Sequence, residues 1–347
     1  RGNSCIKMNY SFLDFEKLEK KFLLSNDIIS QKFENIVVIG FGGSTQGSKA
    51  INSFLNEIRV IYIDHLHSDI IDKLVVTLNL EKTGFIFISK SGKTSETLSI
   101  FEYLIDKCKN KINISNHFFS LTEDKQSQLH DFALQHSMKS IEHDPDIGGR
   151  FSIFSNTSLI PGFYFNSDLC KNFIEGSREA MEEKGLAEDL ADQLSQSIKN
   201  NKNIAAYLIY GHELLEVGNW KKQLFAESLG KNGKGFMPVV SEMTKDQHSI
   251  LQLFLDGPRN VFFEIMSMES DKVNLINMTL SNHMSAMNET LIKQGLKPRI
   301  SIFKENDVKK LGFYFCIEIL TVIFLAKLLN VDPFVQEAVE LQKNNLS

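Results

Sequence analysis

The segment Ser89-Lys-Ser-Gly-Lys-Thr-Ser-Glu96 concentrates hydroxyl and ammonium groups in one short stretch. It follows an apolar run and opens a segment with helical periodicity, so we expect it at the N-terminus of a helix after a buried strand. Backbone N–H groups, hydroxyls and lysines at such a place suit a phosphate monoester. A nucleoside-triphosphate loop would need a glycine where Phe87 stands. The segment favours a phosphate site over a helix cap with solvated lysines.

A second glycine-rich segment, Gly40-Phe-Gly-Gly-Ser-Thr-Gln-Gly47, also follows an apolar run. The dinucleotide fingerprint GxGxxG requires glycine where Thr45 stands, so the spacing argues against a Rossmann cofactor site. A looser cradle for a polyol or phosphate and a tight strand-to-helix turn both stay open.

The segment from Trp220 to Lys231 has the periodicity of an amphipathic helix, with Trp220, Leu224 and Glu227 on one face. A carboxylate at the border of an apolar face can act as a general base. On these residues alone, an ion pair with Lys231 one turn further is the simpler interpretation. Gly148-Gly-Arg150 and Asp246-Gln-His248 are two further candidates that carry little weight by themselves.

These segments need elements that position them, and short apolar runs predict such elements. Continuous runs rich in Ile and Val are typical of strands buried on both faces of a parallel sheet. With helical patterns such as Ser48–Glu57 and Ser95–Lys107 between them, the runs predict an α/β fold of two doubly wound, flavodoxin-like parallel sheets. A polar stretch from Ser177 to Asn203 separates the two series. The predicted strands are 35–40, 59–64, 84–89 and 118–122, then 204–210, 235–241, 260–266 and 298–303.

Composition limits the function further. The 347 residues carry 38 Lys+Arg and 43 Asp+Glu, a net charge of −5, with 42% hydrophobic residues. This mild acidity predicts no nucleic-acid partner, and four scattered cysteines predict no disulfide framework or zinc site. Phe313–Val331 is apolar but interrupted by Glu318 and Lys327, which predicts a buried helix and no membrane partner. We expect a cytoplasmic protein.

Taken together, the motifs resemble the phosphoglucose isomerase family, whose members have two sugar-isomerase (SIS) domains. The similarity runs from about Asn35 to Lys343, most of the chain. In the family's order the matching pieces are Gly42-Gly-Ser44, Ser89-Lys-Ser-Gly with Thr94, Gly148-Gly-Arg-Phe-Ser152, Gln223 to Lys231, Asp246-Gln-His-Ser249, and Gln252-Leu-Phe-Leu-Asp-Gly-Pro258. The resemblance implies reversible conversion of glucose 6-phosphate and fructose 6-phosphate, a reaction of glycolysis and gluconeogenesis.

The resemblance also implies catalytic roles. Glu227 would move the proton between C2 and C1 through a cis-enediol, and Arg150 would stabilise the developing enediolate charge. His248 would assist opening of the sugar ring, and Lys343 would share that step. The C-terminal motif has Glu337 and Gln342 where the family commonly has proline and glycine.

Binding roles follow in the same way. Gly43, Ser44 and Gln223 would contact the sugar. No metal or cofactor is implied, and the histidine would come from a neighbouring subunit, so a homodimer is expected. Lys93 stands where the family's phosphate loop usually has threonine, exchanging a hydroxyl for a positive charge. The phosphate would be held by Ser89, Lys90, Ser91, Gly92, Lys93 and Thr94.

The expected organisation is an N-terminal helical segment (1–34), a first SIS domain that binds phosphate (35–165), a helical connection (166–203), a second SIS domain with the catalytic Glu and His (204–330), and a C-terminal segment with Lys343 (331–347). Two alternatives stay open: another SIS-type sugar-phosphate isomerase, and a sugar-phosphate-binding regulator without catalysis. Glu227 and His248 together argue against the regulator, which would need neither.

Overall fold

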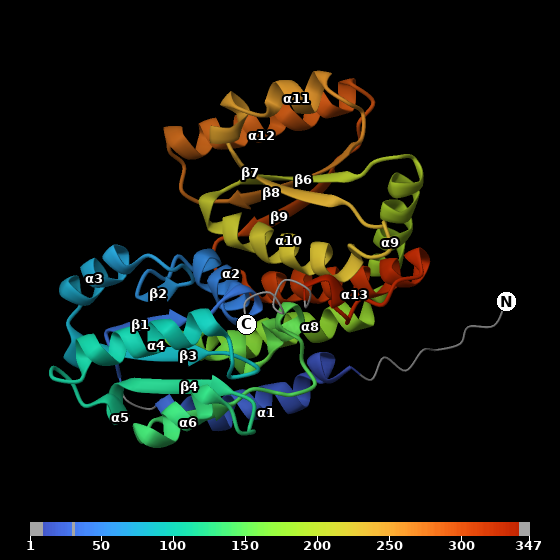
Figure 1. Cartoon of the computed structure of the whole chain (residues 1–347). Coiled ribbons are helices and arrows are strands. Elements are labelled where there is room, and N and C mark those ends of the chain that lie inside the picture. Colours follow the sequence, from blue (N-terminus) through green and yellow to red (C-terminus); the bar gives the residue numbers. More distant parts are fainter. Residues whose placement is uncertain (1–9, 30–31, 340–347) are drawn as a thin grey trace. The chain divides into compact units, whose positions relative to one another are not determined.

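The computed structural model of this chain describes residues 10–29 and 32–339 (Figure 1). These residues form two compact units. The first contains the described residues within Arg1–Ser48 and Ile58–Ile174, and the second those within Lys49–Glu57 and Glu175–Ser347. Helix α2 (Gln46–Phe54) therefore contributes residues to both units, as does α8 (Leu169–Glu182).

The first unit contains a five-stranded parallel sheet with the order β2-β1-β3-β4-β5. This is the flavodoxin-like order, in which the chain direction across the sheet reverses between β1 and β3. The loops after these two strands therefore border a crevice suited to a ligand. The strands are β1 (Asn35–Ile39), β2 (Val60–Ile63), β3 (Thr83–Ile88), β4 (Phe118–Thr122) and β5 (Lys139–Glu142).

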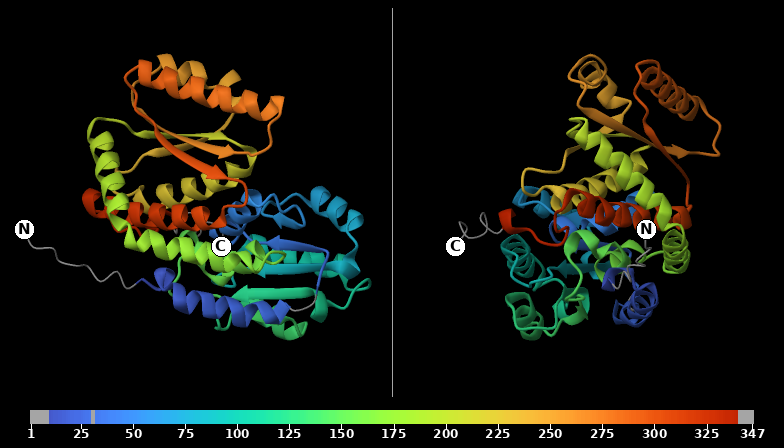
Figure 2. Two further views of the ribbon diagram at one scale, coloured as in Figure 1. Left: turned by 180° about the vertical axis from the view of Figure 1, so that it is seen from behind. Right: turned by 90° about the vertical axis from the view of Figure 1, so that its right-hand side faces the viewer.

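Helices cover both faces of this sheet. On one face α3 (Ser68–Thr77), α4 (Ser95–Cys108) and α6 (Gln128–Gln135) pack against alternate residues of β1 and β3, such as Val37 and Phe87. On the opposite face α1 (Phe15–Asn26) packs against α7 (Asn156–Gly162) (Figures 1 and 2). The four-residue helix α5 (Ile114–His117) leads into β4.

The second unit repeats the arrangement with the order β7-β6-β8-β9, again entirely parallel. Its strands are β6 (Ile204–Tyr210), β7 (Met237–Met243), β8 (Val261–Glu269) and β9 (Arg299–Lys304). Figure 2 shows one face covered by α11 and α12 and the other by α10, with α9 and α13 beside it. These helices are α9 (Lys184–Lys199), α10 (Leu215–Leu229), α11 (Leu251–Asp256), α12 (Leu275–Lys293) and α13 (Val308–Leu329). Two parallel sheets confirm the predicted fold class.

Helix α13 is long and apolar enough to cross a membrane, but 78% of its most apolar window is buried inside the structure. It packs against α9 and α10. Its acidic residue Glu318 is fully buried and pairs with Lys221 and Arg299. The helix is a core element of the second unit, as the interrupting charges predict.

The predicted strands agree with the observed ones to within about three residues at each end. The exception is β5 (Lys139–Glu142), which the apolar runs did not reveal. It lies at the edge of its sheet, where only Ile141 of its residues is buried, so it has no continuous apolar run. Cys108, Cys170 and Cys316 are free and buried, as expected of packing residues.

Candidate active site

The hydroxyl-rich segment forms the turn between β3 and α4. Ser89 is buried directly after the strand, and its hydroxyl lies 2.8 Å from that of Thr94, the residue before α4. The backbone N–H of Lys93 donates to Ser91 Oγ at 3.2 Å. Gly92 has a φ of +63°, and a Cβ there would lie 2.0 Å from Ser127 Oγ. Both the backbone conformation and the lack of space therefore require glycine at this position. The result is a compact turn with hydroxyls at the N-terminus of a 14-residue helix, a favourable place for an anion.

The two lysines of this turn differ in their surroundings. Lys90 Nζ donates to the carbonyl of Pro145 at 2.6 Å and lies 3.7 Å from a carboxylate oxygen of Glu123. Lys93 is exposed. The positive charge of Lys90 is therefore shared with Glu123, whereas Lys93 adds its charge at the surface of the turn.

The turn after β1 lies beside the segment that carries Arg150. A Cβ on Gly43 would lie 2.3 Å from the carbonyl carbon of Gly149, so the two backbones touch. The hydroxyl of Ser152 ties them together, because it donates to the carbonyls of Gly43 at 3.1 Å and Gly149 at 2.7 Å. Arg150 is 4% exposed, with its guanidinium carbon 5.1 Å from the ring of Phe151. The first unit thus brings Gly43, the neighbouring Ser44 and Arg150 into one region.

Since β1 and β3 are adjacent in the sheet, both turns leave the same edge at the same crevice. Gly40, at the end of β1, is so close that a Cβ there would lie 3.0 Å from the carbonyl oxygen of Ile88. Gly43, Ser44 and the turn Ser89–Thr94 therefore occur at neighbouring strand ends. Such an edge can bind an anionic group through one turn and hydroxyl groups through the other.

In the second unit, Glu227 lies in the last turn of α10, half-buried, with both carboxylate oxygens held by amides. Gln223, one turn earlier, donates to Oε1 at 2.9 Å, and Gln336 donates to Oε2 at 2.5 Å. Lys231 Nζ donates to the backbone carbonyls of Glu227 and Ser228, both at 2.7 Å, so it caps the helix end. Two amide donors fix the direction of the carboxylate without neutralising it.

The inner face of α10 is anchored by a network of buried charges. Lys221, 1% exposed, forms ion pairs with Glu264 of β8 and Glu318 of α13. Arg299 of β9 completes the set by donating to Glu318 Oε1 at 2.5 Å. Burial alone would raise the pKa of Glu264, but Arg299 and Lys221 outweigh it and lower that pKa to about 2. The helix that carries Glu227 is thereby tied to two strands and to a neighbouring helix.

His248 is exposed in the short helical turn Lys245–His248 that follows β7. Helix α10 precedes β7 in the chain and ends near the start of that strand, so Glu227 and His248 lie toward opposite ends of β7. Between Met237 and Met243 the strand spans about 20 Å. One chain therefore does not bring these two side chains together. Lys343 lies outside the residues that the structure describes.

The sequence motifs did not indicate the roles of two residues near the site, Gln336 and Lys221. Gln336 belongs to none of the motifs described from the sequence, yet its amide holds the Glu227 carboxylate. The amphipathic pattern of the helix does not distinguish Lys221 from its exposed neighbours, although Lys221 is buried and ion-paired. The only available signal was Glu318, an acidic residue within an apolar helix, because a buried charge requires a partner.

Comparisons of this chain with a family model and with curated proteins all identify phosphoglucose isomerases as its relatives. The family model described as phosphoglucose isomerase matches residues 26–312 of this chain. A probable glucose-6-phosphate isomerase of Methanococcus maripaludis is 30% identical, and the alignment covers 96% of this chain and 82% of that protein. A glucose-6-phosphate isomerase of Campylobacter jejuni is 28% identical over 89% of this chain and 84% of its own length.

Solved structures show the same architecture. A hypothetical protein from Thermus thermophilus superimposes with a TM-score of 0.86 at 26% identity, covering 96% of this chain and 88% of that one. A glucose-6-phosphate isomerase from Chlamydia trachomatis gives a TM-score of 0.80 at 20% identity, covering 95% of this chain and 72% of that chain. The second likeness, at this identity, concerns the fold alone.

Proposed function

Since this chain belongs to the phosphoglucose isomerase family, we propose that it is an aldose-ketose isomerase that interconverts glucose 6-phosphate and fructose 6-phosphate. The observation that carries this proposal is the Glu227 carboxylate, which two amide donors hold in a defined direction on an anchored helix. A regulator that only binds sugar phosphates has no use for a base held in this way. The curated relatives named glucose-6-phosphate isomerase support the choice of substrate.

In the proposed reaction the substrate's phosphate binds at the turn Ser89–Thr94. Its oxygens would accept hydrogen bonds from backbone N–H groups at the start of α4 and from the hydroxyls of the turn. Lys93 would add a nearby positive charge, and Lys90 would act from its position beside Glu123. Gly43, Ser44 and Gln223 would contact the sugar. Phosphate binding would orient C1 and C2, which converts binding energy into positioning.

The chemical step is a proton transfer between neighbouring carbons. Glu227 removes the proton from C2 of the open-chain aldose, the electron pair of that bond forms the C1–C2 double bond, and O1 takes up a proton. The resulting cis-enediol then loses the proton of O2 and receives the carboxyl proton at C1, which gives the ketose. Arg150 would stabilise negative charge on the enediol oxygens. The two amide donors hold the Glu227 carboxylate in a fixed direction, which a base needs for proton transfer.

Ring opening needs a second acid-base group, and we propose that His248 of a second copy of the chain supplies it. The support is that His248 is exposed and lies about 20 Å, the length of β7, from the level of Glu227. A histidine donated in a homodimer would resolve this separation. Lys343 is proposed to share the ring-opening step. Cytoplasmic localisation and the bounds of the five segments of the chain stay predictions.

Incubation with glucose 6-phosphate in deuterated water tests the proposal. We expect fructose 6-phosphate to form with deuterium at C1, because the carboxyl proton exchanges with solvent during the enediol stage. Recovered glucose 6-phosphate should gain deuterium at C2. If the purified protein forms no ketose and exchanges neither position, the function is wrong; conversion of an amino-sugar or heptose phosphate instead would identify another SIS-type isomerase.

A further inference from the structure

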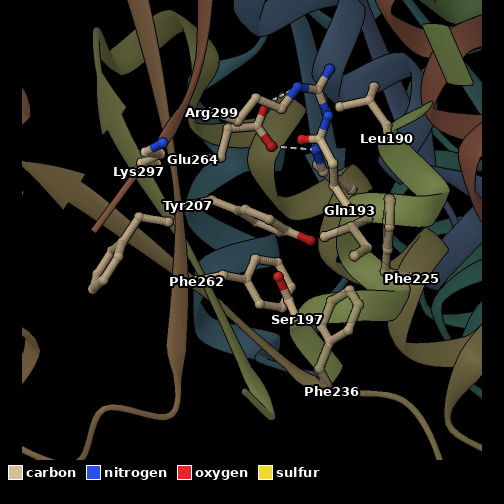
Figure 3. A pocket seen from close by; sticks show the side chains of 13 residues that line it. Leu190, Gln193, Ser197, Tyr207, Phe225, Phe236, Phe262, Glu264, Lys297 and Arg299 are labelled. Atoms are coloured by element: carbon tan, nitrogen blue, oxygen red, sulfur yellow. Dashed lines mark hydrogen bonds and ion pairs between the residues drawn. The ribbon is translucent and has the colours of Figure 1, made fainter. Parts of the chain in front are cut away.

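A cavity of about 90 Å³ lies in the second unit, on the face of the sheet that α9 and α10 cover. Figure 3 shows it between side chains of these helices and of β6, β8 and β9. Phe236 directly precedes β7 and Phe262 is near the start of β8, so the cavity is at the amino-terminal edge of the sheet. The turns proposed to bind phosphate leave the carboxyl edge of the other sheet, so this cavity is a separate feature.

The cavity uses the inner side of α10. Phe225 lines it and is buried, whereas Glu227, two residues further, points to the other side of the helix. No step of the proposed isomerisation uses the cavity residues. The cavity therefore requires an explanation other than substrate binding.

The hydroxyl of Tyr207 is the most informative group in the cavity. Tyr207 is 2% exposed, and its hydroxyl has no hydrogen-bond partner among the residues that the structure describes. Figure 3 shows this hydroxyl directed into the space between Gln193 and the ring of Phe262. Burial raises the pKa of Tyr207 well above 10, so the group is a neutral donor at physiological pH. Leaving such a donor unsatisfied is costly, which favours a ligand that accepts its hydrogen bond.

The charges around the cavity favour a neutral ligand. Lys221 and Arg299 are cations, and they pair with the two carboxylates of Glu264 and Glu318. Because this set is balanced, an ionic ligand would lose its hydration without gaining a free counter-charge. Lys297 is exposed and so lies at the rim.

The rest of the lining indicates the shape of the ligand. The rings of Phe225, Phe236 and Phe262 form apolar walls, on which another ring packs well. The volume is below the roughly 150 Å³ that encloses a whole benzene ring, but the cavity is open at its rim, where Lys297 is exposed, so a single ring can enter with one edge left outside. We propose that this cavity binds a neutral single-ring aromatic molecule whose hydroxyl or carbonyl oxygen accepts a hydrogen bond from Tyr207.

The test uses two ring probes with the full chain, 4-fluorophenol and 4-fluorotoluene, followed by fluorine NMR. Both should bind, and Tyr207→Phe should weaken 4-fluorophenol roughly fivefold while leaving 4-fluorotoluene unchanged, the effect of one neutral hydrogen bond. Ser197→Met, which extends a lining side chain into the cavity, should weaken both probes. Gln196→Met, at an exposed position next to it in α9, should weaken neither.

The proposal is overturned if neither probe binds the wild type, which would leave water as the partner of Tyr207. It is equally overturned if Ser197→Met and Gln196→Met have the same effect, or if Tyr207→Phe changes both probes alike. These measurements involve no turnover, so they stand or fall independently of the isomerase proposal.

Discussion

The two parallel sheets share one strand order but differ at the crevice where that order reverses. In the first unit the turns after β1 and β3 contain glycines, hydroxyls and the exposed Lys93. In the second unit the equivalent strands β6 and β8 lead to a cavity of about 440 Å³ whose lining has more carboxylates than cations, namely Glu213, Glu269, Asp271 and Glu305 against Lys272 and Lys304. Carboxylates at this position repel a phosphate. Topology places a crevice in both units, and the side chains decide which of them can take an anion.

The units also differ in how they hold their proposed functional groups. The phosphate turn of the first unit depends on backbone conformation, above all at Gly92. The carboxylate of the second unit depends on side chains, with amides on the outer side of α10 and ion pairs on its inner side. Substitutions in the phosphate turn should therefore lower the affinity for substrate. Substitutions around the carboxylate on α10 should lower turnover or folding stability.

The largest effect is expected from Glu227→Gln. Removing the base should lower kcat by about 10²- to 10⁴-fold, because the amide cannot accept the C2 proton. Binding of a six-carbon sugar-acid phosphate inhibitor should change little, since the phosphate turn is intact. Steady-state kinetics and inhibitor titration check this expectation. Turnover like that of the wild type would remove Glu227 as the base.

Lys221→Met tests the buried side of α10. The free energy of unfolding should fall by about 3–5 kcal/mol, because two buried carboxylates lose a partner. The matched control is Lys222→Met at the exposed neighbouring position, which should change stability by no more than about 0.5 kcal/mol. Urea denaturation measures both. Equal losses in the two variants would show that the ion pairs do not anchor the helix.

The same network predicts a dependence on pH. The pKa of Glu264 is about 2 in the folded chain against an ordinary value of 4.5, so its contribution to stability is present above pH 4.5 and lost as pH falls toward 2. The stability difference between wild type and Glu264→Gln should therefore be largest near neutrality and shrink below pH 4.5. Urea titrations at pH 7, 4 and 3 measure it. A difference that stays constant would contradict the ion-pair explanation.

Gly92→Ala tests the backbone device of the first unit. The added Cβ would force an alanine into the left-handed conformation and would clash with Ser127, so the turn must change shape. We expect a loss of about 1.4 kcal/mol of phosphate binding, which raises KM for glucose 6-phosphate roughly tenfold. Gly295→Ala is the control, because Gly295 also has positive φ but nothing lies within 4 Å of an added Cβ. If both variants raise KM equally, the turn has no special role in binding.

The smallest effect is expected from Lys93→Thr. An exposed charge near a phosphate contributes about 0.5–1 kcal/mol, so KM should rise two- to fivefold and become less sensitive to salt. Lys111→Thr, at an exposed position beyond the other end of α4, should leave KM and its salt dependence unchanged. An unchanged KM in Lys93→Thr would mean that Lys93 points to solvent and does not contact phosphate.

Much of the fold could be predicted because its signals are local. Apolar runs located the central strands of both sheets, since strands buried on two faces must be apolar along their length. The edge strand β5 was missed for the same reason, because one exposed face breaks the run. The position of the phosphate turn was also predictable, as a strand end, a glycine and a helix start follow one another in the chain.

The sequence alone thus determined the two α/β units, the order of motifs and the residue types available for chemistry. Only the tertiary structure decided the partners of those residues. Gln336 reaches Glu227 across 109 positions of the chain, and Lys221 meets Glu264 and Glu318 on two other elements. Local sequence specifies a backbone conformation through short-range sterics and burial, but a side chain's partner depends on which distant elements pack against it. The same holds for the Tyr207 hydroxyl, which has no hydrogen-bond partner within residues 10–29 and 32–339, because no pattern in its strand specifies what packs against it.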